Sequence, residues 1–355
     1  MKTIFLFCAG VFLLILAILL GGKSFNRMKY KIRTKNGIQK SGYMRIGGID
    51  QYYQIRGENI ENPIILVIHG GPGNNMSDFS YCWQTDLEKE YTIVHWDQRG
   101  CGNTYYRDTQ AERPSLELLL ADLDEVVNYL RVDYHKEKLI IMGHSWGTFL
   151  GAIYAGKHPE KVSAYISVSQ VLDFNQSERI SAQEAVRLAK IAGKEQDIPK
   201  INDLLEQITT YQKIGKAEVK SLLEFRQLKE KYLPKQYGNK MILYRLFSPY
   251  MNLNEIRWMF SINKMLESNN KIYEMLMIDG RLSMYDYPLH YDIPVIMIIG
   301  NQDWTTPYSM ALDYYQAISA PQKEFITIEG SGHLPFIDHS KEFSKVLEKA
   351  LNKID

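Results

Sequence analysis

The chain has few cysteines and almost no net charge, and each scarcity argues against a class of protein. Its 355 residues include three cysteines, Cys8, Cys82 and Cys101, whose positions show neither paired nor metal-ligand spacing. We therefore expect no disulfide framework and no metal site. With 42 basic and 41 acidic residues the formal net charge is +1, so no overall field attracts nucleic acid, and nucleic-acid binding is not expected. Internal repeats and low-complexity tracts are also lacking, whereas a 45% hydrophobic content is enough to fill a globular core.

One long apolar run stands near the start of the chain. Residues 4–20 form about 17 consecutive apolar positions, at the short end of what spans a bilayer. We therefore expect residues 1–22 to be a single-pass membrane anchor whose partner is the lipid bilayer. A cleaved secretory signal is the alternative, but the sequence around Leu20 to Lys23 lacks the small-x-small cleavage pattern. Cys8 lies near the start of the run, so lipid attachment there is not expected.

A basic linker, residues 23–41, is expected after the anchor. It is predicted to rest on anionic headgroups or to be simply solvated. The positive-inside rule would keep the following domain in the cytoplasm, whereas a signal anchor of the bacterial kind would place it outside, and the sequence does not decide between these sides. The basic residues in its first part, up to residue 35 and with no acid among them, are Lys23, Arg27, Lys29, Lys31, Arg33 and Lys35.

Strand and helix patterns alternate over residues 42–172. Residues 63–68 and 91–96 are short apolar runs typical of buried parallel strands, and residues 115–131 have leucine and valine at helical spacing with Ser115 as N-cap. This alternation predicts an α/β fold with a doubly wound, mostly parallel sheet. Further strands are expected at 42–47, 50–56, 138–142 and 162–168.

The alternation stops near residue 173 and resumes near residue 288. Residues 173–287 are rich in Lys, Glu, Leu, Met and Tyr at helical spacing, so they predict an inserted helical cap. Strands return at 294–299 and 324–328, and a closing helix is expected over 341–351. Residues 42–172 and 288–355 are therefore predicted to form the two parts of one core.

The most informative motif follows the strand at 138–142. It reads Gly143-His144-Ser145-Trp146-Gly147 and is followed by an amphipathic segment. A serine between two such glycines, after a strand and before a helix, indicates a nucleophile elbow, in which side chains at the glycine positions would collide with backbone. Ser145 is the predicted nucleophile.

A serine nucleophile needs a base and a group that orients the base, and in sheets of this type these follow in the order acid, then histidine. Asp303 follows the strand at 294–299, and His333 follows the strand at 324–328, so both are predicted to complete a catalytic triad. Asp303 has an alternative role as the cap of a helix near residue 307. His333 has an alternative role as a structural loop histidine. His339 is the nearest competing base but is expected at the start of the final helix, and Asp338 lies beyond the histidine in the chain.

The tetrahedral intermediate also needs amide donors for its oxyanion. The backbone N–H of Trp146 is one predicted donor, and the N–H of Gly71, in the glycine-rich loop after residue 68, is the other. His69 and His144 are expected to brace these loops rather than to transfer protons.

The loop after the strand at 91–96 combines charged residues with turn glycines. Asp97 and Arg99 are expected to hold this loop beside the site. Cys101 is expected to be a packed thiol without a catalytic role.

In these residues the chain resembles the α/β-hydrolase superfamily and, within it, the serine peptidases of the proline iminopeptidase type. The resemblance covers residues 42–172 and 288–352. It implies Ser145, Asp303 and His333 as the triad, Gly71 and Trp146 as oxyanion donors, and no cofactor or metal. The blocks that carry it are His69-Gly70-Gly71-Pro72-Gly73, Asp97-Gln98-Arg99-Gly100-Cys101-Gly102 and Gly143-His144-Ser145-Trp146-Gly147.

Two features depart from the family pattern. The elbow has His144 where iminopeptidases commonly have glycine, and the tryptophan-rich cap motif whose glutamates hold the substrate's free amine is not found between residues 173 and 287. Glu178 and Glu184, near the start of the cap, are the candidates for that substrate-binding role, with solvated helix-surface glutamates as the alternative.

The sequence therefore leads to a membrane-anchored serine hydrolase that works through an acyl-enzyme, with an aminopeptidase acting on short peptides as the first hypothesis. An esterase or amidase of apolar acyl compounds is the second, because the cap is rich in Tyr and Met. A non-catalytic binding protein on the same fold is the third. The oligomeric state is left open.

Overall fold

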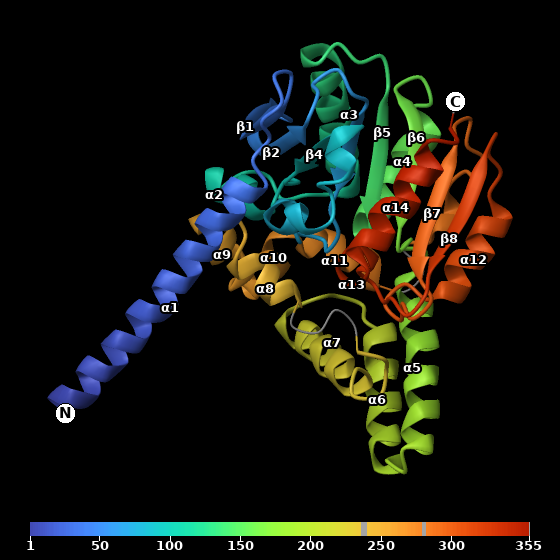
Figure 1. The fold of residues 1–355 in the computed structure, drawn as a ribbon. Coiled ribbons are helices and arrows are strands. Elements are labelled where there is room, and N and C mark those ends of the chain that lie inside the picture. Colours follow the sequence, from blue (N-terminus) through green and yellow to red (C-terminus); the bar gives the residue numbers. More distant parts are fainter. Residues whose placement is uncertain (236–239, 279–281, 355) are drawn as a thin grey trace.

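The centre of the fold is a sheet of eight strands in the order β1-β2-β4-β3-β5-β6-β7-β8 (Figure 1). The computed structural model describes residues 1–235, 240–278 and 282–354. β1 and β2 form an antiparallel hairpin, β2 pairs antiparallel with β4, and the other neighbours are parallel, which confirms the predicted α/β fold with a mostly parallel sheet. The strands are β1 Ile38–Ile46, β2 Ile49–Gly57, β3 Ile64–Ile68, β4 Thr92–Trp96, β5 Leu139–His144, β6 Val162–Val168, β7 Val295–Gly300 and β8 Lys323–Ile328.

The central strands, β3 to β7, are buried along almost their whole length because helices cover both faces of the sheet. Alternate residues of β5 point to opposite sides: Ile141 joins one apolar cluster and Met142 the other. The first cluster lies under α3 (Leu116–Asp133), α4 (Trp146–Lys157) and α12 (Tyr308–Ala317). The second lies under α13 (Pro335–Asp338) and α14 (Ser340–Leu351).

The helices between β6 and β7 form the cap. In Figure 1 the α5–α7 group projects beyond the sheet, and α8–α11 turn back beneath its β1 to β4 half. Asp173 starts the cap as an N-cap, because its side chain accepts a hydrogen bond of 2.8 Å from the backbone N–H of Gln176. The cap helices are α5 Phe174–Ile191, α6 Ile198–Thr209, α7 Lys216–Lys229, α8 Lys240–Leu246, α9 Leu253–Met259, α10 Ile262–Ser268 and α11 Asn270–Met277.

The N-terminal helix α1 spans Lys2–Lys29 and projects away from the body (Figure 1). It is longer than the apolar run because Lys, Arg, Ser and Met continue a helix without strain. Among the described residues, one helical segment, Leu6–Lys29, is long enough and apolar enough to cross a membrane, and it is exposed. A membrane anchor and a signal sequence both fit this observation. The helix therefore takes in the first part of the expected linker, and β1 begins at Ile38, before the expected residue 42.

Candidate active site

Ser145 occupies a sharp turn between β5 and α4. Its backbone angles are φ 52° and ψ −123°, which residues other than glycine rarely adopt. A Cβ at Gly143 would lie 2.5 Å from the carbonyl oxygen of Gly147, and a Cβ at Gly147 would overlap the carbonyl oxygen of Ile68. Both glycines are therefore required by sterics, as the elbow pattern predicts.

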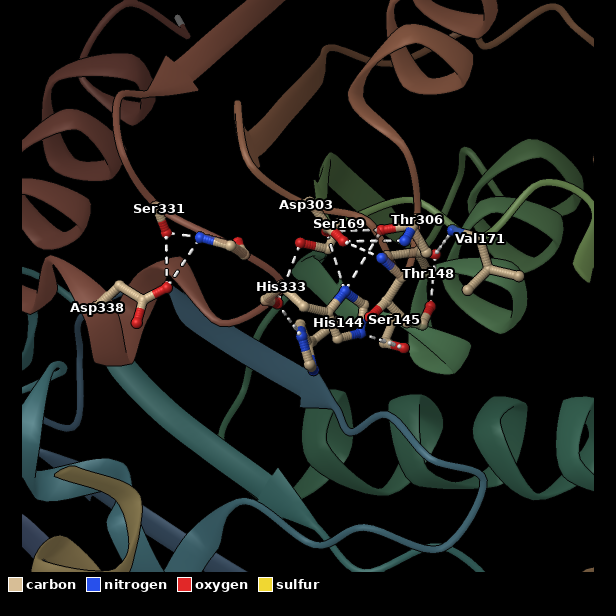
Figure 2. A network of polar contacts seen from close by, with 12 residues as sticks. His144, Ser145, Thr148, Ser169, Val171, Asp303, Thr306, Ser331, His333 and Asp338 are labelled. Atoms are coloured by element: carbon tan, nitrogen blue, oxygen red, sulfur yellow. Dashed lines mark hydrogen bonds and ion pairs between the residues drawn. The ribbon is translucent and has the colours of Figure 1, made fainter. Parts of the chain in front are cut away.

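Ser145, His333 and Asp303 form a continuous chain of hydrogen bonds, although the three residues come from separate loops (Figure 2). His333 Nε2 lies 3.0 Å from Ser145 Oγ, and His333 Nδ1 lies 2.9 Å from Asp303 Oδ2. With the imidazole proton on Nδ1 donated to Asp303, Nε2 is left to accept the serine hydroxyl proton. The geometry suits removal of that proton during nucleophilic attack.

Asp303 is held as an anion. Its carboxylate is almost fully buried, which by itself would raise its pKa, but His333 and the hydrogen bonds of Thr306 outweigh burial and hold the pKa below its usual value. Oδ1 accepts bonds of 2.9 Å from the N–H groups of Thr305 and Thr306. Asp303 thus closes the turn before α12 with one oxygen and faces His333 with the other. The alternative role considered from sequence, the cap of the helix near residue 307, is not found, because α12 begins after Pro307 without a side-chain cap.

The two competing residues lie behind the histidine loop. His339 precedes α14, as expected, with Nδ1 3.8 Å from Glu342. Asp338 Oδ2 accepts bonds from the N–H of Gly332, at 2.9 Å, and from the Ser331 hydroxyl, at 3.2 Å (Figure 2). Asp338 therefore supports the loop that carries His333, a role that the sequence did not reveal.

The glycine-rich loop packs directly against the nucleophile. A Cβ at Gly70 would lie 2.9 Å from Ser145 Cβ, so only glycine fits there without displacement. Gly71, with φ 120°, lies in the region that favours glycine. Trp146 is the first residue of α4, where backbone N–H groups have no partner within the helix and the helix dipole favours negative charge.

His69 and His144 are buried and held neutral. Burial lowers the pKa of His69 to about 4, and burial together with the nearby His333 lowers the pKa of His144 to about 3. His69 Nε2 accepts a bond of 3.1 Å from the N–H of Gln98, and His144 Nε2 donates one of 3.0 Å to the carbonyl of His333. Both imidazoles therefore tie loops together, as expected.

Comparison with known proteins places the chain in a family. A family model described as "alpha/beta hydrolase fold" matches residues 63–340. The chain belongs to the α/β-hydrolase fold family. The hydrolase is 26% identical over 319 residues to "Probable aminopeptidase YbaC" of Bacillus subtilis (strain 168), covering 90% of this chain and 98% of that protein.

Two further matches agree with this assignment. The hydrolase is 24% identical over 328 residues to a proline iminopeptidase of Lactobacillus helveticus (strain DPC 4571), covering 88% of this chain and 98% of the relative. The crystal structure of a proline iminopeptidase-related protein from Thermus thermophilus superposes with a TM-score of 0.59 at 19% identity, over 89% of this chain and 98% of that one. At that identity the superposition shows a shared fold alone.

The loop after β4 is built as a buried polar support for the hydrolase site. Arg99 Nε and Nη2 each donate a bond of 2.8 Å to the carboxylate of Asp122 in α3. Asp97 accepts a bond of 2.9 Å from the N–H of Asn103, and burial raises its pKa to about 7. Cys101 is buried, and burial raises its thiol pKa, so the thiol is not activated as a nucleophile.

The two cap glutamates predicted from sequence are both paired with cations of the cap. Glu178 is buried and forms ion pairs with Arg226, at 2.7 Å, and with Lys229. Burial would raise the pKa of Glu178, but the two cations outweigh burial and lower it. Glu184 pairs with Arg187 at 2.7 Å on the surface of α5. The sequence did not indicate that either carboxylate has a partner within the cap.

A second group of buried acids escaped the sequence analysis. Glu255 in α9 accepts a bond of 3.2 Å from the Ser77 hydroxyl, and Asp78 pairs with Arg245 at 2.8 Å. Burial first, then the charges of Asp78 and Asp97, raise the pKa of Glu255 well above its usual value. The available signal was the capping box from Asn252 to Glu255, which marks the start of α9 but not its burial.

Proposed function

We propose that this α/β hydrolase is a membrane-anchored serine hydrolase with Ser145 as nucleophile, His333 as general base and Asp303 as the orienting acid. The observation that carries the proposal is the unbroken chain from Ser145 Oγ to His333 Nε2, at 3.0 Å, and from His333 Nδ1 to Asp303 Oδ2, at 2.9 Å. In this mechanism Oγ bonds to the substrate carbonyl carbon while its proton moves to Nε2, and the same proton then passes to the leaving group. Water, activated by His333, releases the acyl group and restores Ser145.

The oxyanion of each tetrahedral intermediate would be stabilised by the N–H groups of Gly71 and Trp146. The tight packing of Gly70 against Ser145 and the position of Trp146 at the start of α4 support this assignment. Because these donors belong to the backbone, the role depends on the loop's shape more than on any side chain.

We further infer that the substrates are short peptides with a free amine, as for a proline iminopeptidase. The support is the family membership, the aminopeptidase and iminopeptidase descriptions of two relatives that match nearly their full length, and the three sequence blocks around the site. No cofactor takes part in the proposed mechanism.

The experiment that tests catalysis is labelling of the full-length protein with a fluorophosphonate probe. Wild type is expected to label, and Ser145→Ala is expected not to. The matched control is Ser169→Ala, because Ser169 also contacts the histidine loop, through the His333 carbonyl at 3.2 Å, but lies outside the proton path. Absence of labelling in wild type would support a non-catalytic binding protein on this fold.

The experiment that tests specificity compares three substrates: a prolyl amide with a free amine, the same amide with the amine acetylated, and a short acyl ester. A peptidase of the proposed kind is expected to cleave the free amine form and to lose most activity when that amine is blocked. Equal cleavage of the free and acetylated forms would contradict the aminopeptidase proposal.

The pairing of Glu178 and Glu184 with cap cations favours a second candidate, an esterase or amidase of apolar acyl compounds. A carboxylate that already binds two cations is a weaker ligand for a substrate amine, because the amine would have to displace them. For this candidate the acyl ester is the best of the three substrates, and Glu178→Gln leaves the ratio of free to acetylated amide cleavage unchanged.

Helix α1 is the proposed anchor. Its exposed apolar length supports insertion into a bilayer, and the basic residues that follow suit an anionic surface. Extraction of membranes with alkaline carbonate is expected to leave the full-length chain in the pellet. A mature chain that begins after Gly22 would identify a cleaved signal instead.

A further inference from the structure

Exposed apolar side chains gather on one part of the cap. Outside α1, more than half of the large apolar side chains that are exposed among the described residues lie between residues 242 and 262. Leu253 and Phe260 are 77% and 78% exposed, nearly as open as an extended chain. A concentration of exposed large apolar side chains in one segment indicates an interaction site more than ordinary surface does. The apolar face consists of Ile242, Leu243, Leu246, Leu253, Phe260 and Ile262, on α8, α9 and α10 and their junctions.

Helix α1 is fixed to the body beside this face. The Asn26 side-chain amide donates a bond of 2.9 Å to the carbonyl of Phe247, which directly follows α8, and Gly22 packs against the Phe247 ring. Tyr30, at the end of α1, contacts Tyr81 with 5.1 Å between ring centroids. In Figure 1 α8 accordingly lies near the body end of α1. The direction in which α1 leaves the body is therefore set by packing on the same side as the apolar face.

The position of these contacts along α1 sets their depth in a bilayer. At 1.5 Å per residue, Gly22 lies roughly 3 Å and Asn26 roughly 9 Å beyond Leu20, the last residue of the apolar run. The headgroup layer on each side of a bilayer is about 5–7 Å thick. If the apolar run of α1 fills the hydrocarbon layer, Gly22 and the Phe247 ring lie at headgroup level and Asn26 lies at the outer edge of that layer. The end of α8, which Phe247 directly follows, therefore lies near the membrane surface.

The charges around the apolar face also fit a membrane surface. Exposed basic side chains accompany it on the cap, Arg257 and Lys264, and the basic residues from 23 to 35 adjoin it at the end of α1. Arg257 lies 4.4 Å and Lys264 lies 5.5 Å from the ring centroid of Tyr106, so these two cations, from α9 and α10, lie close to each other on the helices that carry Leu253 and Ile262. Cations beside an apolar surface favour the anionic headgroups of a bilayer over a neutral partner.

We propose that the apolar face is a second membrane contact, which rests in the interface of an anionic bilayer and fixes the orientation of the hydrolase on it. The inference depends on the proposed anchoring by α1. It also has a consequence for the site, because α9 contacts the glycine-rich loop: Trp258 Nε1 donates a bond of 2.7 Å to the carbonyl of Gly73. The membrane contact therefore lies on the outer side of the cap segment whose inner side meets the active-site loop.

The test uses nitroxide spin labels on the full-length protein in vesicles of phosphatidylcholine and phosphatidylglycerol. Single cysteines replace Leu253 or Phe260 on the apolar face, in a background that carries Cys8→Ser and Cys82→Ser. Val132→Cys and Ile191→Cys are the matched controls, because Val132 and Ile191 are exposed apolar residues on other helices, 72% and 71% exposed. Phe12→Cys reports on α1. The depth of each label is measured by collision with oxygen and with a water-soluble nickel complex, and an unchanged thermal unfolding midpoint verifies the fold of each variant.

Labels at positions 253 and 260 are expected about 5–10 Å inside the boundary between headgroups and acyl chains, with labels at 132 and 191 in water. A label at position 12 within the bilayer together with labels at 253 and 260 in water overturns the second contact while leaving the anchor intact. A label at position 12 in water overturns both. Because no activity is measured, failure of the proposed catalysis leaves this test unaffected.

Discussion

Thr306 donates a hydrogen bond of 2.7 Å from its hydroxyl to Asp303 Oδ2, the same oxygen that faces His333. The carboxylate that orients the imidazole therefore depends on a neighbour three residues later in the chain. The Asp303 carboxylate is therefore held by three donors: the backbone N–H groups of Thr305 and Thr306 and the Thr306 hydroxyl.

Replacement of Thr306 by valine is expected to lower kcat about 10-fold, because a hydrogen bond to a charged group contributes roughly 1.5–3 kcal/mol. Loss of this donor raises the pKa of Asp303 towards its usual value, so the acidic limb of the pH–rate profile moves to higher pH. Thr305→Val is the control, since Thr305 serves Asp303 only through its backbone N–H. A profile for Thr306→Val that superposes on the Thr305→Val profile would contradict the assigned role.

Replacement of Asp303 by asparagine is expected to lower turnover by about 10⁴ while the protein stays folded, as removal of the orienting acid does in other triads. Circular dichroism and steady-state kinetics on the same preparation measure the two effects. Turnover near that of wild type would show that a different carboxylate orients His333.

Replacement of Asp338 by alanine is expected to slow turnover by roughly 10-fold without changing the pH profile, because a lost pair of acceptor contacts loosens the loop but leaves the triad chemistry intact. The Gly332 N–H and the Ser331 hydroxyl both lose their bonds to Asp338 in this variant. A change in the pH profile would assign Asp338 to the proton path instead.

Replacement of Gly70 by alanine is expected to lower the rate of fluorophosphonate labelling by about 10²-fold, as for the loss of an oxyanion donor, because the new methyl group would push the loop away from Ser145. Gly156→Ala in α4 is the matched control: its Cβ would meet Tyr291 at 3.7 Å, an ordinary contact. Labelling of Gly70→Ala at the wild-type rate would show that the loop tolerates this displacement.

Asp97 makes the stability of the protein depend on pH. Burial raises its pKa to about 7 from the usual 3.8, so the folded state retains a proton that the unfolded state releases between these values. Its contribution to stability is therefore full below about pH 4 and is lost as the pH rises through about 7. Asp97→Asn is expected to remove this loss of stability at high pH. The free energy of unfolding, measured with urea between pH 4 and pH 8, should therefore rise for the variant relative to wild type as the pH rises.

The exposed carboxylate of Asp86 provides the control for this measurement, since its side chain is 68% exposed. Asp86→Asn is expected to show the same pH dependence as wild type. A difference between wild type and Asp97→Asn that stays constant with pH would mean that Asp97 is ionised in the folded state throughout.

The parts of the site that could be predicted from sequence share a local cause. Ser145, Asp303 and His333 each follow a strand within a few residues, and parallel strands end at one edge of the sheet, so adjacency in space follows from the strand pattern. The glycines of the elbow were predictable for the same reason, because the turn they permit is determined by neighbouring backbone.

The partners within the cap could not be predicted, because they depend on how helices far apart in the chain pack. Glu178 and Arg226 are 48 residues apart, and nothing in helical spacing indicates that they meet. The end of α1 at Lys29 was missed for another reason: hydropathy marks where a helix stops being apolar, not where it stops being helical.

The hydrogen bond from Trp258 to Gly73 joins the cap to the glycine-rich loop that packs against Ser145. Replacing the cap with that of another hydrolase would remove this hydrogen bond and leave the Gly73 carbonyl without the Trp258 indole as its donor. Changes to the cap that keep Trp258 of α9 would therefore preserve the contact between the cap and the glycine-rich loop.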